Sequence, residues 1–282
     1  MKLAPILSAG LALFAAACGL DLEGAAGKGD SYETALRQAN EAREAGNLDT
    51  ALPLYGRALQ AKPDGLEAKL GLGQSYLALG APEEAAAQFR DVLTRRSGDP
   101  VALRGLAAAL ISMGQPTMAE RQLEAVLQAD AADYRALNAM GVALDMQGRH
   151  TEAQARYRKG IELAPDYPSL RSNLGLSLAI SGQFQESLAL LVPIANSPIA
   201  DGRIRQNLAF AYAMSGDLEQ SLQTSRRDID EQSAQRQLSY FIRLRELPPD
   251  VRSGEIRRNP YFFPQTSRGA WAPGARDATT TG

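Results

Sequence analysis

The sequence predicts an all-α fold, a right-handed superhelical solenoid of about six helix pairs followed by a capping helix. Two observations favour it. Hydrophobic residues make up 45% of the chain and aromatic residues only 6%, and Ala and Leu outnumber the β-branched Val and Ile, a balance that favours helices over sheets. Glycine also recurs every 34 residues, at Gly46, Gly80, Gly114, Gly148, Gly182 and Gly216.

Small residues keep the same phase as the glycines. Seven residues before each glycine the chain has Ala39, Gly73, Ala107, Gly141, Gly175 and Ala209, and five residues after it Ala51, Ala85, Ala119, Ala153, Ser187 and Ser221. Small side chains at both points allow two helices to approach closely. Larger apolar residues, such as Leu72 and Phe89, also recur in phase with helical spacing.

A period of 34 residues with this pattern resembles the tetratricopeptide repeat over about residues 32–230. Each glycine is expected to end the first helix of a pair at positive φ, which glycine adopts without steric strain. Repeats are expected to begin near Tyr32, Leu66, Pro100, Tyr134, Pro168 and Gly202. The array with its capping helix then spans residues 32–245, and residues 246–282, rich in Pro, Gly, Arg, Ser and Thr, are expected to be mostly disordered.

The N-terminus has the pattern of an export signal. Residues 1–17 carry Lys2 and then an apolar stretch that ends in three alanines, directly before the chain's only cysteine, Cys18. This resembles a bacterial lipobox, which predicts a lipoprotein signal peptide, fatty acyl chains such as palmitate on Cys18, and a flexible tether over residues 18–31. Because Gly19 follows the cysteine, the expected location is the outer membrane, facing the periplasm, with the inner membrane as the alternative. An ordinary signal peptide with an incidental cysteine is the other interpretation.

Composition argues against several classes of function. With 30 basic and 32 acidic residues the net charge is only −2, which gives no basic field for nucleic acid. One Cys and one His do not suffice for a cysteine–histidine metal site or a His-based nucleophile pair. We therefore expect no cofactor or metal, and interpret His150 as a packing residue at a helix start. The counts leave a Ser–Lys or carboxylate enzyme open, but repeat arrays usually bind and the sequence contains no catalytic motif, so we expect no enzyme activity.

A repeat array of this type binds protein segments on its concave face, which the first helix of each pair lines. The repeat phase assigns to this face Leu70, Leu77, Arg104 and Ile111 in repeats two and three. In repeats four to six it assigns Asn138, Val142, Met146, Asn173, Leu176, Ile180, Asn207, Phe210 and Met214. We predict that these last nine form a partner-binding groove, with amides that bond a partner's backbone; the alternative is that they fill the superhelix itself or lie under the N-terminal tether.

Four aromatic residues stand out in the C-terminal tail, Tyr261, Phe262, Phe263 and Trp271. They are expected to dock either on the array or on a partner.

A narrower resemblance lies in repeats five and six. The stretch ESLALLVPIANSPIADGRIRQNLAFAYAMSGDLEQSLQTSRRDID, followed by LSYF, is similar to the TadD lipoproteins of the tight-adherence (Flp) pilus system. The resemblance implies a scaffold that helps to assemble or localise the pilus secretin in the outer membrane. Two alternatives are a type IV pilus pilotin and an adaptor for cell-wall enzymes.

Overall fold

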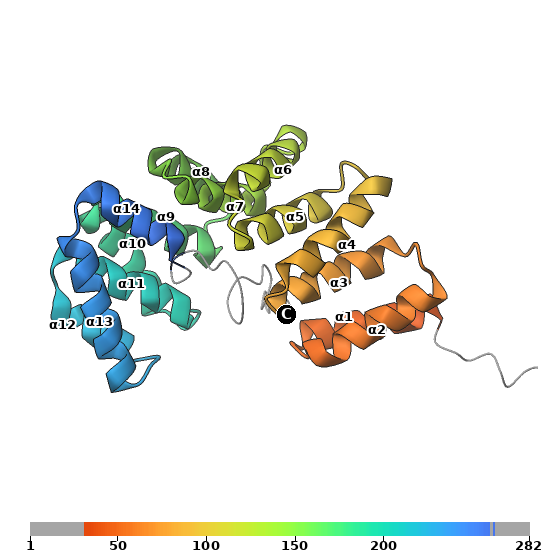
Figure 1. Cartoon of the computed structure of the whole chain (residues 1–282), viewed down its shortest axis with the longest axis horizontal. Coiled ribbons are helices and arrows are strands. Elements are labelled where there is room, and N and C mark those ends of the chain that lie inside the picture. Colours follow the sequence, from red (N-terminus) through yellow and green to blue (C-terminus); the bar gives the residue numbers. More distant parts are fainter. Residues whose placement is uncertain (1–30, 260–261, 263–282) are drawn as a thin grey trace, which may run out of the picture.

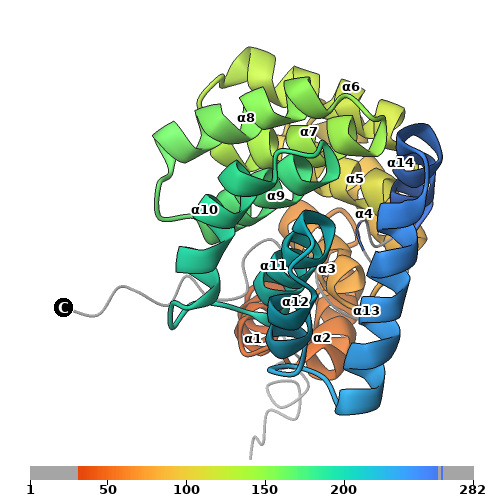
Figure 2. The ribbon, with the colours of Figure 1, turned by 90° about the vertical axis from the view of Figure 1, so that its left-hand side faces the viewer.

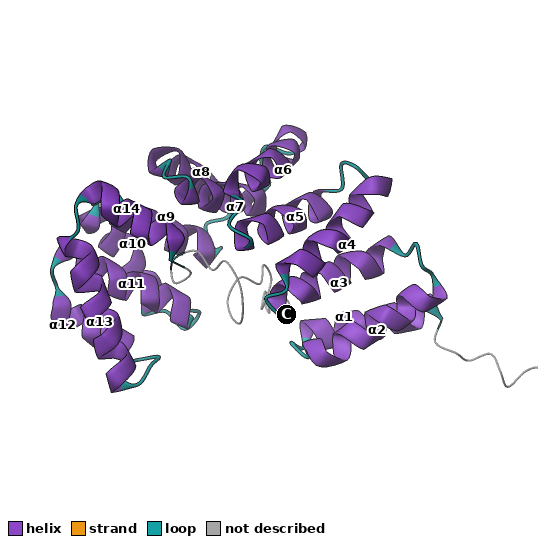
Figure 3. Cartoon of the chain, viewed as in Figure 1, coloured by secondary structure: helices purple, strands orange, loops and turns teal. Residues whose placement is uncertain are grey.

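A computed structural model describes residues 31–259 and Phe262. Every regular element in this part of the chain is a helix (Figure 3), which confirms the predicted all-α fold. The helices are α1 (Tyr32–Glu44), α2 (Leu48–Ala61), α3 (Leu66–Ala78), α4 (Pro82–Arg95), α5 (Pro100–Ser112), α6 (Pro116–Ala129), α7 (Tyr134–Met146), α8 (His150–Leu163), α9 (Pro168–Ile180), α10 (Phe184–Ala195), α11 (Gly202–Ser215), α12 (Leu218–Ser225), α13 (Glu231–Glu246) and α14 (Pro249–Arg258).

The helices α1 to α12 form six antiparallel pairs that stack into an arc (Figure 1). Each helix contacts the next one along the chain, and each first helix also contacts the first helix of the following pair, from α1–α3 to α9–α11. The second helices α6 and α8 lie on the outer side of the arc. Figure 2 shows the same molecule turned by a right angle, with α13 alongside α12 and α14 continuing beyond it. A single core runs through repeats two to six, because each pair buries its apolar face only against its neighbours.

All six glycines of the ladder have positive φ, between 69° and 99°. The amide of each glycine donates to the carbonyl three residues earlier, and the next amide donates to the carbonyl five residues before itself, as from Arg149 to Leu144 at 2.9 Å. With the glycine in the left-handed conformation, these two amides bond carbonyls that a helix terminus otherwise leaves unpaired. The predicted role of the ladder is confirmed.

Close helix packing explains the small residues that share this phase. A Cβ atom built on Gly141 of α7 would lie 2.3 Å from the ring of Tyr157 in α8, and one on Gly73 of α3 would lie 2.9 Å from Phe89 in α4. Both distances are too short for a real contact. Glycine at this position, seven residues before the ladder glycine, therefore makes room for the large side chain that the second helix of the pair inserts there.

We expect Gly148→Val to lower the free energy of unfolding by about 1–2 kcal/mol or more, because a β-branched residue is strained at φ +79°. The added side chain would also displace Arg257, whose Nη1 lies 2.4 Å from the site of a Cβ. Urea denaturation measures the loss.

The matched control for this change is Gly56→Ala in the middle of α2. That position has space for a Cβ and ordinary helical φ, so the variant should gain up to about 1 kcal/mol. Equal stability of Gly148→Val and the parent would contradict the role of the turn.

The C-terminal part departs from the sequence-based expectation. The capping helix α13 ends at Glu246, one residue later than expected, and α14 lies within the segment that was expected to be mostly disordered. Two consecutive prolines stand at its start, a position that suits proline, and Ile256 is buried against the array. The local composition predicted disorder because it does not reveal burial against distant residues. This burial is what stabilises α14.

Other predictions fall outside the described residues. They concern the signal peptide, Cys18, the tether up to residue 30, and the aromatic residues Tyr261, Phe263 and Trp271. Among the described helices, none is both long and apolar enough to cross a membrane.

Candidate functional site

The nine residues predicted to line the partner groove lie on α7, α9 and α11, three on each helix, and all are buried. Their exposed fractions range from 0% for Phe210 to 8% for Met146 and Ile180. The apolar members belong to the main core of the array. We expected these side chains to line an open groove. Contacts within the chain bury them instead, in line with the alternative that they fill the superhelix itself. Their role in binding a partner stays a prediction.

The three predicted amides bond within the array. Asn173 on α9 donates to the side chain of Asn138 on α7 at 2.9 Å, and Asn207 on α11 donates to the hydroxyl of Ser172 on α9 at 2.9 Å. Because buried amides need partners, these bonds tie the first helices of repeats four to six together in register. In this structure the amides bond neighbouring repeats, and their bonding to a partner's backbone stays a prediction.

Phe210 is enclosed by aromatic rings from the C-terminal part of the chain. Its ring centroid lies 5.4 Å from that of Phe241 on α13 and 4.7 Å from that of Phe262, both in edge-on geometry. Phe262 is only 2% exposed, which confirms for this residue the expectation that a tail aromatic docks on the array. Edge-on pairs of this kind add stability beyond the buried area.

The equivalent positions in repeats two and three are more accessible. Leu70 and Leu77 on α3 and Arg104 on α5 are half-buried, whereas Ile111 is buried. Arg104 forms an ion pair with Asp133, the residue that caps α7. The accessible part of the predicted concave face therefore lies on α3 and α5.

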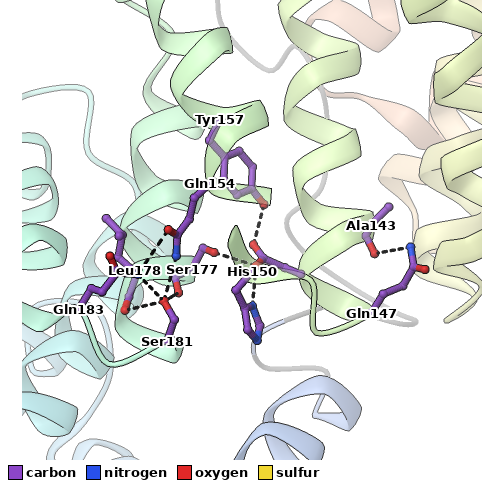
Figure 4. A network of polar contacts seen from close by, with 10 residues as sticks. Ala143, Gln147, His150, Gln154, Tyr157, Ser177, Leu178, Ser181 and Gln183 are labelled. Atoms are coloured by element: carbon purple, nitrogen blue, oxygen red, sulfur yellow. Dashed lines mark hydrogen bonds and ion pairs between the residues drawn. The ribbon is translucent and has the colours of Figure 1, made fainter. Parts of the chain in front are cut away.

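A buried polar cluster joins repeats four and five, and sequence reasoning missed its centre, Asp145. Its carboxylate accepts bonds from His150 Nδ1 at 2.8 Å, from the hydroxyl of Ser177 at 2.7 Å and from the hydroxyl of Tyr157 at 3.0 Å. Figure 4 shows these donors converging from α8 and α9. His150 was expected to be a packing residue; it packs, and it also bonds this carboxylate.

A signal for this cluster was present in the repeat phase. Asp145 stands three residues before its ladder glycine, where the other repeats have Arg43, Leu77, Ile111, Ala179 and Ala213. A carboxylate at a position that is otherwise mostly apolar marks a special site. The nearest parallel is repeat one, where Arg43 donates to the hydroxyl of Tyr55 at 3.1 Å.

Burial raises the pKa of Asp145, and the bonds from His150, Ser177 and Tyr157 act in the opposite direction. The pKa of the Tyr157 hydroxyl also lies well above its usual value, first because of burial and then because of the Asp145 charge. His150 and Ser177 donate to the same carboxylate oxygen, so the imidazole is not placed as a base for the hydroxyl. The cluster thus joins α7, α8 and α9 rather than forming a nucleophile.

A cavity of about 300 Å³ opens between α6, α7 and α8. Met140 and Leu144 form part of its lining, and Arg149 bonds Glu120 at its edge at 2.7 Å. No group of three or more metal-ligating side chains occurs among residues 31–259 and Phe262.

The paired helices, the glycine turns and the nearest-neighbour core define a helical-repeat solenoid, a class that binds proteins on extended surfaces. Family models of the tetratricopeptide repeat match residues 36–100, 76–142 and 134–167. Residues 36–167 of the chain are therefore tetratricopeptide repeats. No curated protein matches it significantly.

Solved structures share the fold at low sequence identity. A thermophilic tetratricopeptide-repeat protein from Thermus thermophilus is 22% identical, with a TM-score of 0.58 over 64% of this chain and 98% of that one. One from Parabacteroides merdae is 15% identical, with a TM-score of 0.63 over 75% and 84%. The Cut9–Hcn1 complex of the APC/C is 15% identical, with a TM-score of 0.65 over 75% and 43%. These similarities establish the fold.

Proposed function

We propose that this protein is a lipid-anchored scaffold that faces the periplasm and binds envelope proteins, assisting the assembly or localisation of a tight-adherence (Flp) pilus secretin. The curved array carries the scaffold role, since stacked helix pairs offer an extended surface to a partner segment. The narrow sequence resemblance in repeats five and six supports the secretin as the partner. The lipobox-like sequence before Cys18 supports the anchor.

Anchoring has a direct test. Replacing Cys18 with Ser should remove acyl-lipid labelling and move the protein from the membrane fraction to the soluble periplasmic fraction, because acyl chains bind a bilayer at about 0.8 kcal/mol per buried methylene. Fractionation of cells that express the parent and the variant measures this shift. Unchanged partitioning of the variant would leave the lipobox interpretation without support.

Partner binding is best tested on the accessible positions, since changes at the nine buried residues would also disturb the core. Leu70→Ala with Leu77→Ala removes two half-buried apolar side chains from α3. Truncation of two binding anchors typically costs about 1–3 kcal/mol, so capture of the secretin should weaken about ten- to a hundredfold. Met118→Ala on α6, where the side chain is 49% exposed, is the matched control and should bind as the parent does.

The measurement is a pull-down of the purified secretin, with the thermal unfolding of each variant recorded beside it. Parental capture by a folded Leu70/Leu77 variant would place the binding surface elsewhere. Capture of a type IV pilus secretin, or of a cell-wall hydrolase, in place of the tight-adherence secretin would favour the pilotin or the adaptor alternative.

A further inference from the structure

The chain does not end at its capping helix. After α13 it continues through Leu247 into α14, and Phe262 follows; we call residues 247–259 together with Phe262 the C-terminal segment. The guanidinium of Arg252 donates to the carbonyls of Arg245 at 3.2 Å and of Leu247 at 2.9 Å. These bonds fix the direction in which the segment leaves α13.

Two apolar side chains attach the segment to the array. Ile256 is 1% exposed and Phe262 is 2% exposed, and both belong to the main core. Phe262 inserts beside Phe210 of α11 and Phe241 of α13. Asn259 adds a hydrogen bond to the hydroxyl of Tyr240 on α13.

The segment contacts both repeat four and repeat six. Phe262 packs on α11 of repeat six, and the guanidinium of Arg257 lies at the turn between α7 and α8, where Gly148 has no side chain to block it. These are the repeats that carry the nine residues predicted to bind a partner. The segment therefore lies against the part of the array where the repeat phase predicts a ligand.

Few contacts hold the segment in place. Ile256 is the only side chain of α14 described as buried, and Val251 is 46% exposed. By contrast, α11 buries most of its apolar side chains. Regions with few buried contacts open at lower free energy than the core does, and a repeat array needs only its own neighbouring repeats to stay folded.

We propose that the C-terminal segment is an intramolecular ligand that regulates the array. In the resting chain Phe262 occupies the site formed by Phe210 and Phe241. When the segment leaves, the same site takes an aromatic side chain from a segment of the partner. This inference rests on the proposed scaffold function. It adds the chemistry of the partner, which presents an aromatic residue near a short helix. It also names the element that competes with the partner, the C-terminal segment.

A synthetic peptide of residues 247–263 tests the proposal without any partner protein. It is titrated, by fluorescence anisotropy, into the full chain carrying Cys18→Ser and into the same chain with Phe262→Ala. A tethered ligand competes at a high effective concentration, so weakening it should expose the site. We expect the peptide to bind the Phe262→Ala chain at least about tenfold tighter than the parent, equivalent to about 1.4 kcal/mol.

Val251→Ala is the matched control, since it truncates an exposed residue of the same helix and should bind the peptide as weakly as the parent. A peptide with alanine in place of Phe262 should lose binding to the Phe262→Ala chain. Equal affinity of the parent and the Phe262→Ala chain for the peptide would overturn the proposal, as would binding that survives loss of the aromatic side chain in the peptide.

Hydrogen exchange provides a second measurement. In the parent, the amides of α14 should exchange at least about tenfold faster than those of α11, and Ile256→Ala should speed exchange in α14 while leaving α1 to α10 unchanged. Exchange of α14 and α11 at one common rate would show that the segment does not leave independently, and so would overturn the proposal. A parental dimer that becomes monomeric in the Phe262→Ala chain would show that Phe262 binds a second copy instead. Neither measurement uses the secretin, so failure here is distinct from failure of the proposed function.

Discussion

Replacing Asp145 with alanine should lower the free energy of unfolding by about 3–5 kcal/mol, because it leaves buried donors without their acceptor. Three side chains would lose a partner at once, those of His150, Tyr157 and Ser177. Urea denaturation of the purified chain gives the loss. Tyr157→Phe, which removes a single donor and keeps the ring, should cost about 1–2 kcal/mol. If Asp145→Ala lost less free energy of unfolding than Tyr157→Phe does, the central role of the carboxylate would be contradicted.

The effect of Asp145 should also depend on pH. Burial raises the pKa of this carboxyl in the folded chain, so the folded protein keeps the proton to a higher pH than the unfolded chain does. The part of the stability that depends on the proton of Asp145 is then fully present below the unfolded pKa of this carboxyl, about 3.9, and falls as the pH rises through the folded pKa. The free energy of unfolding of the parent minus that of Asp145→Asn should therefore be most positive in acid and decrease toward neutral pH. A difference that grows with pH would mean that the ionised carboxylate is the stabilising form.

Phe210→Ala should lower the free energy of unfolding by about 3–5 kcal/mol, since it opens a cavity at a fully buried position and removes two aromatic pairs. This differs from what the sequence indicated, because a residue that lines an open groove can be truncated at little cost in stability. Asn207→Ala beside it should add a further loss, as it leaves the hydroxyl of Ser172 without its donor.

Thermal and urea unfolding followed by circular dichroism measure the Phe210→Ala loss. Leu79→Ala is the control, since that side chain is 37% exposed and its truncation should change stability by no more than about 0.5 kcal/mol. A loss of less than about 1 kcal/mol for Phe210→Ala would show that the surrounding rings relax into the space.

The repeat period predicted the backbone of this protein well, because a period of 34 residues encodes local geometry. A glycine such as Gly148 ends a helix through its own φ, and a small residue such as Gly141 determines how near the next helix can come. Neither effect depends on distant parts of the chain. Phe210 and Met214, four residues apart, lie on one side of α11.

The sequence was less informative about what covers that side. Burial of Phe210 depends on Phe241 and Phe262, which come later in the chain and obey no repeat phase. The helix α14 has a polar sequence that begins with proline, and its stabilising contact through Ile256 is tertiary. Asp145 was missed for a related reason, since one departure from the consensus is informative only when the donors around it are known.

Tyr55 and Tyr157 occupy the same position in repeats one and four, yet one hydroxyl accepts from the cation Arg43 and the other donates to the carboxylate Asp145. A phenol hydroxyl both donates and accepts, so it tolerates either sign of charge beside it without a change in backbone. A duplicated repeat that keeps its tyrosine can consequently reverse the charge of the neighbouring position in a few substitutions. The tyrosine position thus offers a route by which copies of one ancestral unit acquire different electrostatic characters while the stacking geometry stays the same.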